Sequence, residues 1–123
     1  MPLTPQNQEA IRVMDESLDN ADRFITADNS FHEALAQATQ NALILILLNS
    51  IVNLLSEQRK QIFEVEGGPQ RGQLHHRRIL ECIVRRDPEA ARAAMRSHLF
   101  QVREDVSAGT ASTQKKAVNP FSA

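Results

Sequence analysis

An acidic residue and a histidine, Asp28 and His32, lie four residues apart in a segment with helical character. On an α-helix four residues make one turn plus about 40°, so the two side chains project from the same face. A carboxylate and an imidazole one turn apart can chelate a divalent cation, which is how helical bundles assemble metal sites. Such a pair is also common on solvated helix faces, so a metal site needs further ligands from elsewhere in the chain.

Three more histidines follow, and two of them fall on apolar stripes. His76 lies three and four residues before Ile79 and Leu80, which places it on the buried side of a helix. The neighbouring His75 lies nearer the edge of that stripe and is expected to be exposed. His98 belongs to the next predicted helix, which is also apolar around this position.

The positions of His76 and His98 match across a predicted helical hairpin. Asp87 is a good helix N-cap and Pro88 suits the first helical position, so a short turn here joins two antiparallel helices. His76 lies eleven residues before Asp87 and His98 eleven residues after it. The two imidazoles are therefore expected at the same height of the hairpin.

Asp28 lies beside the apolar flank of its predicted helix, and the burial expected there favours a metal ion over a set of purely structural histidines. A histidine on an apolar face is usually a core residue with a hydrogen-bond partner, and this alternative stays open. An unpaired buried carboxylate, however, costs several kcal/mol and needs a cation or several donors. One divalent ion would satisfy Asp28, His32, His76 and His98 together. This donor set suits zinc, with nickel or manganese as alternatives, and leaves coordination positions open for water or a ligand.

The rest of the sequence predicts an all-α fold. Alternating apolar runs with hairpin turns are missing, whereas apolar residues recur at helical spacing throughout. We expect an antiparallel bundle of five or six helices forming one domain over residues 1–106, followed by a disordered tail over 107–123. The predicted helices span about 4–21, from 21 or 26 to 38, within 40–61, from 70 or 72 to 86, and 90–106.

The apolar block at residues 42–48 is expected to be buried on several sides, in the bundle centre or in a subunit interface. The apolar segment over residues 42–55 is too short to span a bilayer, and the first residues lack the pattern of a signal peptide, so neither a membrane span nor a signal peptide is expected. With 123 residues, a net charge of −1 and Cys82 as the single cysteine, the chain offers no basic nucleic-acid footprint and no disulfide framework. A cytoplasmic protein is the expectation.

Together these residues resemble the C-terminal effector domain, called FCD, of the FadR subfamily of GntR transcription factors. The resemblance covers about residues 10–105 and depends on the motifs Asp28-x-x-Phe31-His32, Asn41 before the apolar helix, His76-x-x-Ile79-Leu80, Asp87, Ala90 or Ala91, and Met95-x-x-His98-Leu99. It implies a dimerising helical bundle that binds a divalent metal through Asp28, His32, His76 and His98. A small carboxylate or hydroxy acid then completes the coordination.

The resemblance also implies a regulator rather than an enzyme. In that family DNA is bound by an N-terminal winged helix-turn-helix domain, and nothing in this sequence supplies a recognition helix, so that domain and a first effector-domain helix are expected to be missing. Asn41 receives no site role because it lies about 180° from His32 on an ideal helix. Two alternatives remain open, a metal-free helical interaction module and a metal-dependent hydrolase.

Overall fold

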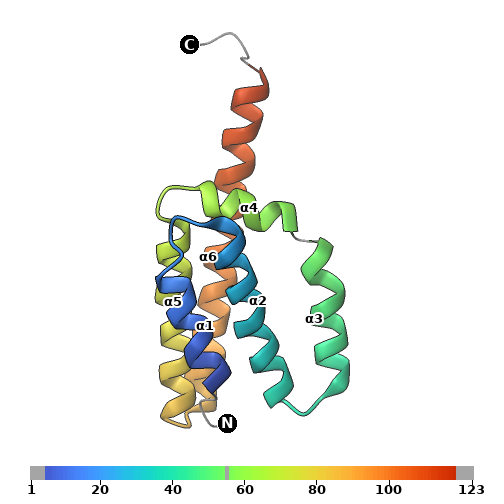
Figure 1. The fold of residues 1–123 in the computed structure, drawn as a ribbon, viewed down its shortest axis with the longest axis vertical. Coiled ribbons are helices and arrows are strands. Elements are labelled where there is room, and N and C mark those ends of the chain that lie inside the picture. The colour runs from blue at the N-terminus through green and yellow to red at the C-terminus, as the bar shows by residue number, and fades with distance from the viewer. Residues whose placement is uncertain (1–4, 55, 119–123) are drawn as a thin grey trace.

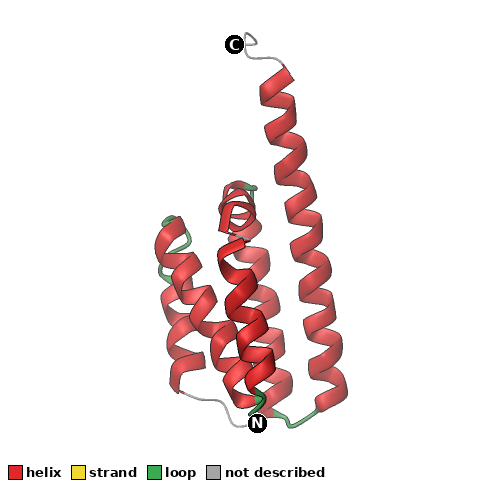
Figure 2. Cartoon of the chain, turned by 90° about the vertical axis from the view of Figure 1, so that its right-hand side faces the viewer, coloured by secondary structure: helices red, strands yellow, loops and turns green. Residues whose placement is uncertain are grey.

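The computed structural model describes residues 5–54 and 56–118, and over these residues it contains six helices and no strand (Figures 1 and 2). The predicted all-α fold is therefore confirmed. The helices are α1 (Pro5–Asp15), α2 (Ala21–Ala38), α3 (Ala42–Leu54), α4 (Ser56–Glu64), α5 (Gly68–Val84) and α6 (Pro88–Val118). No helix among the described residues is both long enough and apolar enough to cross a membrane.

The first predicted helix boundary is wrong, because α1 ends at Asp15 and a turn over residues 16–19 leads to α2. Asn20 caps α2, since its side chain accepts a hydrogen bond from the Arg23 backbone N–H at 3.2 Å. The second helix therefore begins at Ala21, the earlier of the two predicted starts, and Thr26 lies inside it.

The apolar segment forms two helices instead of one. Asn41 begins α3 by accepting a hydrogen bond from the Leu43 N–H at 3.0 Å, so this asparagine has a capping role. In Figure 1, α3 lies at one side of the bundle, next to α2. Four of its large apolar side chains are 42–61% exposed, whereas Leu45 and Leu48 are half-buried, so a place for this block in the bundle centre is wrong. Burial in a subunit interface stays a prediction. The exposed side chains are those of Leu43, Ile44, Ile46 and Leu47.

The C-terminal helix is longer than predicted. α6 continues to Val118, so the prediction of a disordered tail is wrong for residues 107–118, while 119–123 lie outside the described residues. Gly109 lets α6 approach α4 closely, since a Cβ there would lie 3.3 Å from the Cβ of Gln61. This tertiary contact supports a segment whose small polar composition suggested disorder, and no proline follows before Pro120. Beyond the crossing, α6 projects past the other helices (Figure 2).

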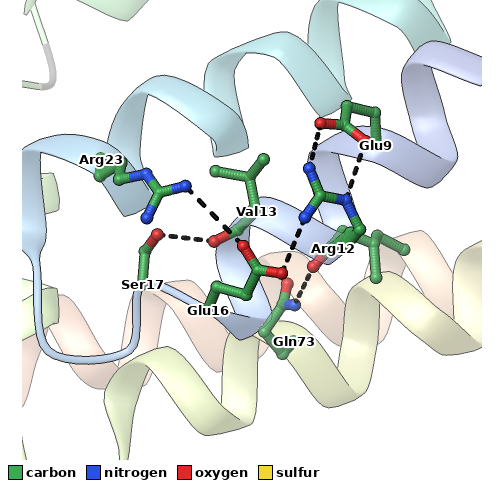
Figure 3. A network of polar contacts seen from close by, with 8 residues as sticks. Glu9, Arg12, Val13, Glu16, Ser17, Arg23 and Gln73 are labelled. Atoms are coloured by element: carbon green, nitrogen blue, oxygen red, sulfur yellow. Dashed lines mark hydrogen bonds and ion pairs between the residues drawn. The ribbon is translucent and has the colours of Figure 1, made fainter.

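The core positions α2 against α1 and α5. Met14, Phe24, Phe31 and Leu80 belong to one buried cluster, and Met14 and Phe31 are fully buried. Polar contacts add to this packing, because Arg12 and Arg23 both approach Glu16 and Gln73 of α5 reaches across to α1 (Figure 3).

The α5–α6 hairpin forms as predicted at its turn. Asp87 accepts a hydrogen bond from the Ala90 N–H at 3.1 Å, which confirms its role as the cap of α6. α5 begins at Gly68, earlier than predicted, because Gly67 with its φ of 73° ends the preceding turn and Pro69 fits the first helical turn. The hairpin brings α5 and α6 side by side along the length that carries the histidines.

Candidate metal centre

Three helices bring three of the predicted ligands together. His32 on α2, His76 on α5 and His98 on α6 offer nitrogen atoms that all lie within 4.8 Å of one another. The imidazole rings of His76 and His98 are 4.7 Å apart between centroids, and those of His32 and His98 are stacked at 5.5 Å. Hence the two hairpin histidines meet at one level, next to the histidine of α2.

The carboxylate of Asp28 faces this cluster. Its Oδ1 atom lies 3.1 Å from Nε2 of His32 and 3.1 Å from Nε2 of His76. Its Oδ2 atom accepts a hydrogen bond from Nη2 of Arg59 at 2.5 Å. Arg59 was not predicted, because it lies in a stretch of α4 that reads as solvated and no spacing relates it to the ligands.

A glutamine fixes which nitrogen of His76 carries the proton. Nε2 of Gln73 donates to the backbone oxygen of Ile11 at 3.1 Å and to Oδ1 of Asp15 at 2.9 Å. Both of these oxygens are acceptors, so Oε1 of Gln73 is the atom that faces Nδ1 of His76 at 2.9 Å. Nδ1 is therefore the donor, and Nε2 presents a lone pair to the cluster. Arg77 pairs with the same Asp15 carboxylate.

His98 is held in the same tautomer by a second set of residues. Its Nδ1 donates to Oε1 of Gln101 at 3.0 Å, because the amide nitrogen of Gln101 donates to Asp105 at 2.6 Å. Asp105 in turn accepts from Arg71 at 2.6 Å. Nε2 of His98 is thus also free to act as a ligand atom, and such outer partners are typical of metal-binding histidines.

Two buried acceptor atoms face each other without a hydrogen. Nε2 of His76 and Oδ1 of Asp28 lie 3.1 Å apart, and neither is in a hydrogen bond. Two lone pairs at this distance repel unless a cation lies between them. Two ligand atoms sharing one divalent metal are separated by about 3.0–3.4 Å in octahedral or tetrahedral geometry. The residues present therefore fit a divalent metal ion.

The ionisation states suit metal ligation. Burial raises the pKa of the Asp28 carboxyl, yet this pKa lies well below its ordinary value, chiefly because the His32 imidazole lies beside it. Burial lowers the pKa of His76 despite the contact with Asp28. Burial and the neighbouring His76 and His32 lower the pKa of His98 to about 3. At neutral pH the carboxylate is charged and both hairpin imidazoles are neutral, as ligands must be.

His75 is half-buried, so the expectation of an exposed side chain is wrong. Its ring stacks on that of His98 with centroids 5.9 Å apart, and burial lowers its pKa. His75 therefore packs against the ring of His98 and is not one of the three histidines whose nitrogen atoms converge.

A cavity of about 230 Å³ opens beside the cluster. Asp28, His32, His76 and His98 contribute to its wall, which is otherwise largely apolar. Such a volume accommodates a small organic molecule in contact with the cluster. The apolar part of the wall includes Phe24, Ile25, Leu48, Val52, Ile62 and Phe63.

Comparison with known proteins assigns the chain to a family of regulatory domains. The family model described as the FCD domain matches residues 5–101. The HTH-type transcriptional regulator LutR of Bacillus subtilis is 34% identical over 107 residues, which cover 83% of this chain and 48% of that protein. The HTH-type transcriptional repressor NanR of Escherichia coli K12 is 28% identical over 110 residues, covering 88% and 42% respectively. The chain thus spans about half the length of these relatives. No solved structure matches it significantly.

Proposed function

The chain belongs to the FCD domain family, and we propose that it is the effector-sensing domain of a transcription regulator whose sensor is a metal centre. Asp28, His32, His76 and His98 are the proposed ligands of one divalent ion. A small carboxylate or hydroxy acid in the adjoining cavity completes the site. The similarity to two transcription regulators supports a regulatory role for the domain rather than an enzymatic one.

The contact between His76 and Asp28 supports the metal more than any other observation. Gln73 makes Nε2 of His76 an acceptor, and this atom faces the Oδ1 acceptor of Asp28 at 3.1 Å. A proton shared between them is a poor substitute, because burial lowers the pKa of His76. A divalent cation removes the repulsion and satisfies both buried atoms.

The donor set favours zinc, with nickel and manganese as alternatives. Three neutral imidazoles and one carboxylate leave a net positive charge on a divalent ion, which attracts an anionic ligand from the cavity. The proposed regulator belongs to the FadR subfamily, acts as a cytoplasmic homodimer and contacts DNA through a separate helix-turn-helix domain. An effector that binds two bundle arrangements with different affinity would shift the population of DNA-binding states.

Elemental analysis after zinc loading and dialysis tests the metal directly. We expect close to one zinc per chain in the wild-type protein. The control variant His75→Ala, which removes the α5 histidine next to His76 that is not among the three converging histidines, should bind the same amount. A content well below one per chain in the wild type would contradict the proposal and favour a metal-free interaction module. A screen of small carboxylates against the zinc-loaded protein, read as a rise in melting temperature, tests the effector class.

A further inference from the structure

Arg59 of α4 contacts the candidate metal centre through one nitrogen of its guanidinium group, Nη2, while Nη1 makes no hydrogen bond. Nη2 donates to Oδ2 of Asp28 at 2.5 Å, and the side chain is 19% exposed. Nη1 is buried and has no hydrogen-bond partner. Arginine is a donor-only side chain, and a buried donor without an acceptor is unfavourable. One half of this guanidinium is therefore used, and the other half lacks an acceptor.

Nη1 of Arg59 makes no hydrogen bond, although polar side chains share the wall of the cavity beside it. Arg59 contributes to the wall of the cavity, whose lining is mostly apolar. A second buried atom without a partner, Oδ1 of Asn29, belongs to another residue of the same wall. Two residues of the cavity wall thus each hold a buried polar atom without a partner, a donor on Arg59 and an acceptor on Asn29. A ligand with a carboxylate and a hydroxyl group would satisfy both.

We propose that Arg59 reads the carboxylate of the effector while it holds Asp28, and that Asn29 accepts a hydrogen bond from the hydroxyl of a hydroxy acid. This inference rests on the proposed function. Nη2 keeps the Asp28 carboxylate oriented, and Nη1 donates to a ligand carboxylate lying over the metal centre. Hydrogen bonds between ionised partners are shorter and stronger than neutral ones, so the site prefers a carboxylate over an uncharged amide of equal size.

The test uses zinc-saturated protein with glycolate and its neutral counterpart glycolamide as probes. In the wild type we expect glycolate to bind more tightly than glycolamide by calorimetry. Loss of a hydrogen bond to a charged group predicts that Arg59→Gln weakens glycolate binding at least tenfold and narrows the glycolate-to-glycolamide ratio by a similar factor. Arg59→Lys keeps the charge and should retain part of the preference. Arg92→Gln changes an exposed arginine of α6 and should match the wild type.

The outcomes separate the two proposals. If the wild type binds zinc and glycolate and Arg59→Gln keeps the wild-type ratio, the role of Arg59 is overturned and the sensor function stands. If Arg59→Gln weakens the binding of glycolate and of glycolamide by the same factor, Arg59 has a purely structural role, and its proposed recognition of the carboxylate is overturned as well. If the wild type binds neither zinc nor glycolate, the sensor function fails as well. Circular dichroism of each variant establishes that the fold is retained.

The hydroxyl contact has its own readout. Acetate lacks the hydroxyl of glycolate, so the ratio of glycolate to acetate affinity measures recognition of this group. We expect Asn29→Leu to lower that ratio and leave the effect of Arg59→Gln unchanged. An unaltered ratio would remove Asn29 from the recognition site.

Discussion

The two hairpin histidines are supported by the same chemistry from different parts of the fold. His76 and His98 each donate through Nδ1 to a glutamine, and each glutamine donates to a carboxylate that pairs with an arginine. The His76 set crosses to α1, since Gln73 also donates to a backbone carbonyl there (Figure 3). The His98 set stays within the hairpin of α5 and α6. Gln73 is 2% exposed, whereas Gln101 is half-buried.

Because of this difference, the orientations of His76 and His98 depend on different parts of the fold. His98 is oriented by a neighbour three residues along its own helix, so its support forms whenever the hairpin forms. His76 is oriented by contacts to residues about sixty positions earlier in the chain. The docking of α1 is therefore part of the metal centre, although α1 supplies no proposed ligand.

The largest effect is expected from His76→Ala. At a free zinc concentration one hundred times the Kd, binding stabilises a fold by about 2.7 kcal/mol, which corresponds to roughly 10 °C in Tm for a domain of this size. His76→Ala should abolish this zinc-dependent rise in Tm. His76 is only 2% exposed, so no other side chain or bulk water can replace the lost ligand. Differential scanning fluorimetry with zinc and with a chelator measures the rise. An equal rise in His76→Ala and in the control His75→Ala would exclude His76 as a ligand.

Replacing each glutamine by leucine tests the comparison itself. Loss of an outer partner of a metal ligand typically costs 10–100-fold in metal affinity. We expect Gln73→Leu to approach the upper value, since it also leaves the contacts to α1 unmade, and Gln101→Leu to lie near the lower value. Competition with a chelating dye measures zinc affinity. Gln70→Leu alters an exposed glutamine of α5 and serves as the control. Equal losses for Gln73→Leu and Gln101→Leu would show that the link to α1 does not matter.

Acidification should destabilise the metal-free protein through the buried neutral histidines. The pKa of His98 is lowered to about 3 in the folded state and is near 6.5 when unfolded, so its contribution is complete above pH 6.5. It is lost as the pH falls from 6.5 towards 3, by about 1.4 kcal/mol per unit, and His76 adds to it with the same sign. Urea unfolding at pH 7, 6 and 5 with a chelator measures the slope. His98→Gln should reduce the slope of the unfolding free energy against pH by the amount that one proton contributes. An unchanged slope would contradict a neutral, buried His98.

The sequence sufficed for the ligands that lie at short, regular spacing. Asp28 and His32 share one helix face, and the turn at Asp87 relates His76 to His98 by a simple count along two helices. These relations are local, so helical geometry predicts them and the structure brings the three histidines together. The all-α fold follows from the same periodicity.

The supporting residues could not be predicted because their contacts cross the bundle. Gln73 meets α1 and Arg59 meets α2 through packing, and no short-range pattern relates either to its partner. The extension of α6 depends in the same way on its crossing with Gln61 at Gly109. Residues 42–48 were expected to be buried from their composition, which cannot specify whether another element covers them.

The smallest effect is expected from the carboxylates at the outer ends of the two sets. The Asp15 and Arg77 side chains are 40% and 51% exposed, and exposed ion pairs contribute about 0.2–1 kcal/mol. Asp15→Asn should therefore change zinc affinity by less than about threefold. The Asp105 side chain is only 7% exposed and accepts from both Arg71 and Gln101. Asp105→Asn should cost more zinc affinity in the same dye competition, which reverses the order expected for the two glutamines. If Asp15→Asn lowers zinc affinity more than Asp105→Asn does, the Asp15 charge acts on His76 through Gln73. The exposure of a carboxylate would then not predict how much it contributes to zinc binding.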